Sequence, residues 1–171
     1  DAWIGHALTK TAANRLGRKA VALNDADAAG LAELQFGAGR DVRGTVLVMT
    51  LGTGIGSALF VDGQLVPNTE LGHLEVDGEE AELRAAARIR IEGKLSWSDW
   101  LQQLNLVVDR LHALLWPDLI ILCGGITEDH PQLATEIDRL GCQRAFVITG
   151  TTIATKTELL RRVQEVLGPR F

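Results

Sequence analysis

The segment best suited to chemistry is a glycine-rich turn between two apolar runs. It reads Thr50-Leu51-Gly52-Thr53-Gly54-Ile55-Gly56 and separates expected strands at 45–49 and 57–61. Glycine lets another group approach the main chain closely. Successive N–H groups in such a turn suit phosphate oxygens, to which threonine hydroxyls add donors. The spacing matches neither a P-loop nor the dinucleotide-binding fingerprint, so the turn is either a phosphate site or only a tight hairpin.

A second polar cluster, Asn24-Asp25-Ala26-Asp27, follows a short apolar run at 20–23 that we expect to be a strand. An alanine-rich helix is expected directly after it, over 28–36. Ligands of open α/β sheets bind where strands end and helices begin. Helix capping by Asn24 or Asp25 is the alternative interpretation. Capping requires one such residue, whereas three of these four are polar, which favours a site.

The loop from Asn68 to Glu75 is short of apolar bulk and rich in groups that bind hydroxyls. Its candidates are Glu70 and His73, three residues apart around a glycine and shortly after the possible phosphate turn. A lone Glu or His is more often solvated surface. The position of this pair favours binding.

The remaining pattern alternates helices and strands. It predicts helices at 4–16, 79–91 and 96–116, a hairpin turn at Asp62-Gly63, and a buried strand at 119–122 that ends in a second glycine turn, Gly124-Gly125. Ser96 and Asp99 resemble a capping box. Trp97 and Trp100 fall on the apolar stripe of the third helix and are expected in the core.

The composition limits the class of protein. The chain has 171 residues and a formal net charge of -5, which argues mildly against partners such as nucleic acid or anionic membrane. It has two cysteines without metal-ligand spacing, no signal-peptide pattern, and no apolar run long enough to cross a membrane. We therefore expect a cytoplasmic protein with reduced cysteines.

Together, the motifs resemble those of ROK-family sugar kinases. The order is Asn24-Asp25-Ala26-Asp27-Ala28-Ala29-Gly30, then Leu51 to Gly56, then Glu70-Leu71-Gly72-His73, then Gly124-Gly125. The strings VPNTELGHLEVDG, LSWSDW and LLWPDLIIL are similar to the polyphosphate glucokinase branch of that family. The resemblance implies an α/β fold, a ribonuclease-H-like lobe of the actin and hexokinase superfamily with a mixed sheet flanked by helices.

The resemblance also implies an activity, the transfer of a phosphoryl group from polyphosphate or ATP, with Mg²⁺, to the 6-hydroxyl of glucose. Asp25 would be the general base. Asn24, Glu70, His73 and, more weakly, Glu75 would hold the sugar. Phosphates would lie at Gly52, Thr53, Gly54, Gly124 and Gly125. The intact family member is expected to be a homodimer. A basic stretch is either a solvated helix surface or an aid to steering a polyanionic donor. It consists of Arg84, Arg88, Arg90 and Lys94.

Two departures from the family pattern bear on these expectations. The Asp-x-Gly-Gly-Thr motif of the family's N-terminal lobe, which would supply the acidic residue for magnesium, does not occur, and neither does the zinc cysteine cluster. We therefore expect residues 1–128 to be a C-terminal kinase lobe with no zinc and impaired activity by itself.

The tail, 129–171, is expected to be an atypical strand–turn–helix. Its part from about 136 is similar to the N-terminal segment of iron-containing alcohol dehydrogenases. The alternatives to a kinase are a sugar-binding fragment of a ROK regulator and an inactive kinase fragment.

Overall fold

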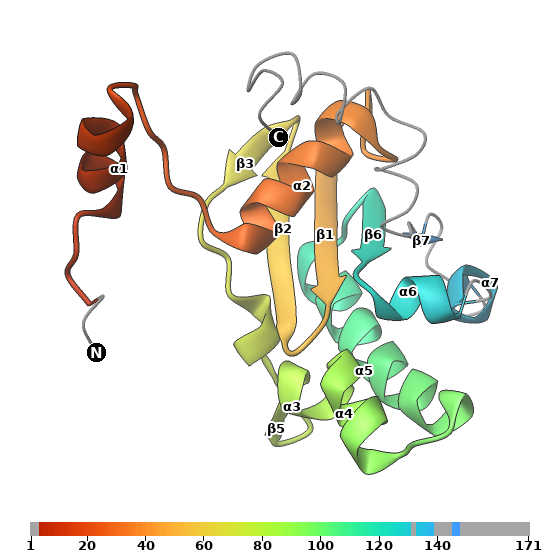
Figure 1. Ribbon diagram of the computed structural model, residues 1–171. Helices are drawn as coiled ribbons and strands as arrows, with labels where there is room; N and C mark the ends of the chain where they lie inside the picture. Colours follow the sequence, from red (N-terminus) through yellow and green to blue (C-terminus); the bar gives the residue numbers. More distant parts are fainter. Residues whose placement is uncertain (1–3, 131–132, 139–144, 148–171) are drawn as a thin grey trace.

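A mixed five-stranded sheet forms the centre of the chain in the computed structural model, which describes residues 4–130, 133–138 and 145–147. The strand order is β3-β2-β1-β6-β7 (Figure 1). β1 (Thr45–Leu51), β2 (Ile55–Val61) and β3 (Gln64–Val66) form an antiparallel meander. β6 (Leu119–Cys123) and β7 (Ala145–Val147) continue the sheet in parallel from β1. The expected α/β fold with a mixed sheet between helices is confirmed.

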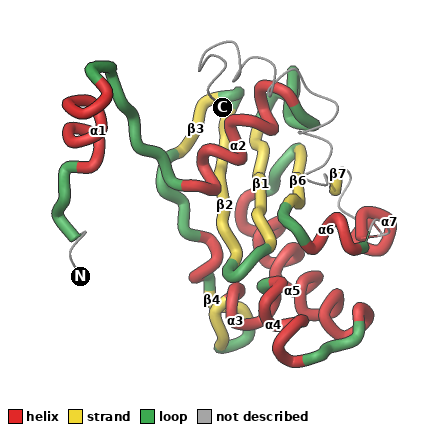
Figure 2. The backbone as a smooth tube through the Cα atoms, viewed as in Figure 1, coloured by secondary structure: helices red, strands yellow, loops and turns green. Residues whose placement is uncertain are grey.

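Two apolar layers sandwich this sheet, as the alternation of side chains along each strand requires. On one face, α2 (Asp25–Phe36) lies over Val46, Val48 and Phe60 (Figure 2). On the other face, α5 (Trp97–Leu115) packs on Leu47 and Met49 with the short helices α3 (Ala81–Ala85) and α4 (Ala87–Gly93). The sheet therefore presents its polar strand ends, and not its faces, to ligands.

The N-terminus of α2 follows directly from its sequence. Asn24 is the N-cap, and its side chain accepts hydrogen bonds from the N–H groups of Ala26 and Asp27. Asp25 and Asp27 lie in the first turn, where negative charge is favoured by the helix dipole. The capping interpretation of this cluster is thus correct, and it places the same residues at the edge of the sheet where the loops gather.

The N-terminal segment differs from the prediction. The helix expected from residue 4 begins later, as α1 (Leu8–Leu16), and buries none of its residues. The strand expected at 20–23 does not form, and Val21 and Leu23 are exposed. β-propensity requires a pleated neighbour to pack against, and this run pairs with no strand of the described sheet. Figure 1 shows α1 standing apart from the sheet.

The helix predicted over 79–91 is interrupted. Glu79–Glu80 form the short strand β5, which pairs with β4 (Glu75–Val76), and α3 then ends at an extended Ala86 before α4 begins. The buried indole of Trp100 donates to the carbonyl oxygens of Ala85 and Ala86 at 3.2 and 3.3 Å. The break therefore satisfies a buried donor that a continuous helix would leave unpaired.

The start of α5 agrees with the predicted capping box. Ser96 Oγ accepts a hydrogen bond from the N–H of Asp99 at 3.1 Å. Trp100 is fully buried, and Trp97 is partly buried, with its ring stacked on that of His130 at 4.1 Å between centroids. Both tryptophans therefore belong to the packed interior or its rim, as expected.

The region after β6 joins the same core. α6 (Ile126–Asp129) spans the expected domain boundary, and Leu133 and Ile137 of α7 (Leu133–Asp138) are buried with the α5 face of the sheet. β7 includes Val147, part of the expected tail strand. Ile148, the expected helix at 154–167 and Cys142 lie outside the described residues, so the separate origin of the tail stays a prediction.

None of the described helices combines the length and the apolar character that a helix needs to span a bilayer.

The α2 layer contains a buried carboxyl group whose pKa affects stability. Glu33 is 0% exposed, and its Oε2 accepts a hydrogen bond from the Ala38 N–H at 3.3 Å. Burial raises the pKa of Glu33 above its ordinary 4.5, an effect that the Ala38 hydrogen bond partly opposes. Between the ordinary and the raised value the unfolded chain binds fewer protons than the folded chain, so stability falls as pH rises through that window.

We therefore expect Glu33→Gln to abolish this decline, so that the variant gains stability relative to wild type as the pH rises above about 4.5. Urea unfolding followed by circular dichroism between pH 4 and 8 measures the difference. Asp109→Asn, at an exposed position on α5, is the control. Parallel pH curves for wild type and the Glu33 variant would contradict the assignment.

Candidate active site

Asn24 joins the N-terminus of α2 to the predicted sugar-binding loop. Its Oδ1 caps the helix, accepting from the Ala26 N–H at 2.8 Å, while its Nδ2 donates to Glu70 Oε1 at 3.2 Å. One amide therefore holds together two motifs that lie 46 residues apart in the chain. Two of the residues expected to hold the sugar are therefore in contact, whereas their binding of sugar stays a prediction.

Asp27 makes a second link to the same loop. Its carboxylate is 2% exposed, and its Oδ2 accepts the backbone N–H of Asn68 at 3.2 Å. Its Oδ1 is buried without a hydrogen-bond partner in the described part of the chain. The sequence marks Asp27 only as part of a polar cluster, because its contact with Asn68, 41 residues away, leaves no signal in the spacing.

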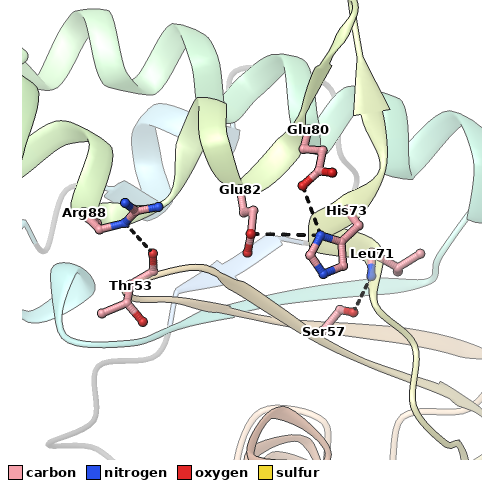
Figure 3. Close-up of polar contacts among 7 residues, drawn as sticks. All are labelled: Thr53, Ser57, Leu71, His73, Glu80, Glu82 and Arg88. Atoms are coloured by element: carbon pink, nitrogen blue, oxygen red, sulfur yellow. Dashed lines mark hydrogen bonds and ion pairs between the residues drawn. The ribbon is translucent and has the colours of Figure 1, made fainter. Parts of the chain in front are cut away.

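Ser57, on β2, holds the loop at 68–73 by hydrogen bonds to its backbone. Its hydroxyl donates to the Thr69 carbonyl oxygen at 2.6 Å and accepts from the Leu71 N–H at 3.0 Å. The Thr69 hydroxyl donates in turn to the Ser57 carbonyl oxygen at 3.3 Å. These bonds, the second of which is drawn in Figure 3, hold the backbone on both sides of Glu70.

His73 lies at the end of η1 (Leu71–His73) and faces two carboxylates (Figure 3). Its Nδ1 is 3.1 Å from Glu80 Oε2 and 4.0 Å from Glu82 Oε1. The hydrogen bond and charge of Glu80, with smaller contributions from the charges of Glu82 and Glu70, raise the pKa of His73 above its ordinary value. Glu70 makes the smallest of these contributions, and the binding of one sugar by Glu70 and His73 stays a prediction.

The β4–β5 hairpin brings Glu80 to His73. A turn at Asp77-Gly78, with both residues at positive φ, reverses the chain so that Glu75 pairs with Glu80. The prediction treated this acidic stretch as part of a helix and missed both partners of His73. The Asp-Gly turn signal at 77–78 could have revealed the reversal. Glu75 is exposed on β4, and its role in binding sugar stays a prediction.

A metal ion would find one candidate set of ligands in the described ranges. The imidazole of His73 and the carboxylates of Glu80 and Glu82 place their ligand atoms within 4.8 Å of one another. The His73–Glu80 hydrogen bond already accounts for this arrangement, and exposed acidic groups often cluster without an ion. We assign no metal to it.

The first glycine turn is the tip of the β1–β2 hairpin. Gly52 N–H donates to the Gly54 carbonyl oxygen at 3.0 Å, so the tight hairpin forms. Phosphate binding by the same turn stays a prediction. Gly54 lies directly against the Glu82 carboxylate, because a Cβ there would meet Glu82 Oε2 at 2.6 Å. Glu82 therefore lies between the glycine turn and His73, as Figure 3 shows.

The two glycine turns border a single groove of about 500 Å³. Gly52, Thr53 and Gly125 line it, together with residues of α4. Gly124 has φ +119, and a side chain there would collide with the Leu51 carbonyl oxygen, so glycine is required for the end of β6 to approach the end of β1. The sequence prediction that both turns serve one region agrees with this groove, although phosphate binding to it stays a prediction.

Asp25 is exposed at the start of α2, next to Asn24. Its Oδ1 accepts from the Ala26 N–H at 2.8 Å. A carboxylate in this position has an oxygen available to solvent and neighbours the Asn24–Glu70 contact. Its convergence with His73 on one bound sugar stays a prediction.

The chemistry of this arrangement is therefore divided between two sides. Hydroxyl-binding groups gather on the loop at 68–73 and at the start of α2, while main-chain turns and a groove lie beside them. Such a division suits the transfer of an anionic group to a hydroxyl, which asks a protein mainly for positioning and one base.

Comparisons with known proteins identify this set of motifs. The ROK family profile matches residues 2–86. A polyphosphate glucokinase of Mycobacterium tuberculosis (strain CDC 1551 / Oshkosh) is 48% identical over 126 residues, which cover 73% of this chain and 48% of that protein. The chain therefore spans about half the length of the curated relatives it matches.

Solved structures agree with this result. The crystal structure of an inorganic polyphosphate/ATP-glucomannokinase from Arthrobacter sp. strain KM matches with a TM-score of 0.75 and 44% identity, over 87% of this chain and 57% of that one. A ROK family glucokinase from Streptomyces griseus matches with a TM-score of 0.67 at 19% identity, over 82% of this chain and 66% of that one, and so supports the fold alone. The expected fold, an α/β lobe of the actin and hexokinase superfamily with a mixed sheet flanked by helices, is confirmed.

The Glu80 contact predicts the titration of His73. Because Glu80 stabilises the imidazolium, Glu80→Gln should lower the pKa of His73 toward its ordinary 6.5. The raised pKa of His73 adds folding stability that is fully present below the pKa of the unfolded chain and is lost as pH rises through the pKa of the folded chain. In Glu80→Gln the folded pKa is lower, so this stability should be smaller and should disappear at a lower pH than in wild type. NMR titration of the imidazole measures the shift.

Glu79→Gln is the matched control, since Glu79 pairs with Arg84 at 3.7 Å and not with His73. Equal His73 titration curves in wild type and the Glu80 variant would show that the contact does not form in solution.

Proposed function

Because the ROK family profile matches residues 2–86, we propose that this chain carries the sugar-binding and part of the donor-binding machinery of a glucokinase. The proposed reaction transfers a phosphoryl group from polyphosphate or ATP to the 6-hydroxyl of glucose. The Mycobacterium and Arthrobacter relatives, at 48% and 44% identity, support it.

The observation that carries this proposal is the hydrogen bond from Asn24 to Glu70. It brings the start of α2, with Asp25, to the loop that ends at His73. A bound sugar needs several hydroxyl partners arranged around the reacting hydroxyl, since proximity and orientation supply much of the rate. The proposed roles are binding of hydroxyls by Asn24, Glu70 and His73.

In the proposed step, an oxygen of Asp25 accepts the proton of the sugar 6-hydroxyl as that oxygen attacks phosphorus. The bond from phosphorus to the bridging oxygen of the donor breaks, and the shortened phosphate chain leaves with the electron pair. A positioned base of this kind contributes roughly two to four powers of ten in rate. Main-chain N–H groups at the glycine turns would bind the donor's phosphate oxygens.

Magnesium accompanies most phosphoryl donors and neutralises their charge. The only metal-like cluster among the described residues contains the imidazole of His73, whereas Mg²⁺ prefers oxygen ligands. These three residues therefore do not fit Mg²⁺. We propose that Mg²⁺ enters with the donor and that no zinc is required.

A sugar-binding ROK regulator is the second candidate, because it too would need Glu70 and His73. Asp25 separates the two functions, since binding alone does not require a base. We also propose that the intact protein is a cytoplasmic homodimer that acts without nucleic acid or membrane partners.

The decisive variant is Asp25→Ala, tested in this chain joined to the N-terminal lobe of a polyphosphate glucokinase relative. We expect glucokinase activity in the joined protein and a loss of at least about 100-fold in kcat in the variant, because the proton has no acceptor. A coupled assay for glucose 6-phosphate measures the rate, and calorimetry should show that glucose still binds.

Asp109→Ala, which removes an exposed carboxylate from α5, is the control and should keep full activity. Full activity of the Asp25 variant would exclude Asp25 as the base. Glucose binding without any phosphorylation by the joined wild-type protein would favour the regulator.

A further inference from the structure

The basic stretch from residue 84 to 94 divides into separate surfaces. Arg84 is turned into the protein, where it donates to Gln103 at 2.6 Å and pairs with Glu79. Arg88 and Arg90 instead line the groove between the glycine turns. The stretch is therefore not a uniform solvated helix surface.

Arg88 is fixed to the first glycine turn at two points. Its backbone N–H donates to the Gly52 carbonyl oxygen at 3.2 Å, and its Nε donates to the Thr53 carbonyl oxygen at 3.0 Å. Figure 3 shows the guanidinium directly beside Thr53. Because both contacts are made to the turn itself, the guanidinium and the turn keep one relative position.

The outer nitrogens of Arg88 remain available to a ligand. Within residues 4–130, Nε is the one guanidinium nitrogen of Arg88 that hydrogen-bonds, and Nη1 has only Glu92 Oε2 at 3.9 Å. The side chain is 40% exposed. With Nε engaged, the planar guanidinium still presents its Nη1–Nη2 edge. Such an edge can bind phosphate in a bidentate manner, which the point charge of lysine does not reproduce.

Arg90 supplies a second cation further along the groove. Its guanidinium lies 3.6 Å from the centroid of the Trp97 ring, and its Nε is buried without a partner among the described residues. Glu92 and Asp129 also line the groove, so its formal charge is balanced. Bulk charge therefore does not select a polyanion here, and the argument rests on the fixed geometry of Arg88.

We propose that Arg88 is a donor-binding residue whose Nη groups hold a phosphoryl group of a linear phosphate chain beside Gly52-Thr53-Gly54. The inference deepens the proposed function, since it concerns the donor of the same reaction. The shared chemistry is a chain of condensed phosphates, which either inorganic polyphosphate or the triphosphate of ATP provides. Arg90 would meet the chain where it extends along α4.

The experiment measures binding of a defined-length inorganic polyphosphate, and separately of ATP, to this chain by calorimetry at several salt concentrations. Arg88→Gln should weaken binding of the phosphate chain about tenfold, since a hydrogen-bonded charge contact is lost. It should also lower the slope of log affinity against log salt, because fewer counterions are released. Arg88→Lys should fall between wild type and Arg88→Gln.

Arg110→Gln, at an exposed position on α5, is the matched control with the same loss of charge. Weaker binding of polyphosphate alone would identify it as the donor recognised by Arg88, and weaker binding of ATP alone would identify the nucleotide. Equal effects of the Arg88 and Arg110 substitutions, an unchanged salt slope, or no binding by wild type would overturn the inference.

Glucose binding separates this result from the proposed function. Both Arg88 variants should bind glucose as wild type does, and their circular dichroism melts should show a folded chain. Normal glucose binding with no effect on either phosphate ligand would remove Arg88 from the donor site and leave the proposed sugar site intact. If the wild-type chain itself failed to bind glucose, the proposed function would be contradicted.

Discussion

The site depends on the two ends of one amide, that of Asn24. Its oxygen satisfies N–H groups at the start of α2, and its nitrogen holds Glu70. A helix N-terminus leaves its first N–H groups without intrahelical partners, so a cap is required there in any case. Using an amide as the cap leaves an N–H donor free for Glu70, which the carboxylate of an aspartate cap would not provide. Local helix stability and the assembly of the sugar loop therefore share one side chain.

The glycine turn is the second point at which distant segments meet. Glu82 lies against Gly54 on one side of the turn, and Arg88 donates to Thr53 on the other. These two residues belong to α3 and α4, separated by the extended Ala86 that the Trp100 indole requires. An uninterrupted helix would rotate one of them away from the turn, since successive residues point around a helix at 3.6 per turn. The break in the helix thus allows the Glu82 carboxylate to lie toward His73 and the Arg88 guanidinium to lie in the groove.

Local signals predicted the elements of this fold, but not the contacts that complete the site. The strand at 119–122 and the Ser96–Asp99 box depend on neighbouring residues and were predicted correctly. The cap at Asn24 is likewise local, and it was the alternative to a binding site. The strand expected at 20–23 failed because it needs a partner that no local pattern supplies. Glu80 was missed because its approach to His73 depends on a hairpin inside an apparently helical stretch. Motif order indicated the candidate site residues, whereas their orientation depends on contacts between segments.

The short distance between α2 and the sheet determines where Asn24 and Asp27 meet the loop at 68–73. The buried face of α2 consists of Ala26, Asp27, Gly30 and Glu33, an unusually small and polar set for a helix over a β-sheet. At Gly30 a single Cβ would lie 2.6 Å from Ala58 Cβ and 2.8 Å from the Phe60 ring, so the helix backbone rests directly on side chains of β2. Any larger residue there would lift the helix, and with it Asn24 and Asp27, away from the loop they hold. The 3.2 Å bonds to Glu70 and Asn68 tolerate little such movement, because hydrogen bonds weaken steeply beyond their usual length. Gly30 therefore controls the geometry of the loop at 68–73, through the distance between a helix and a strand.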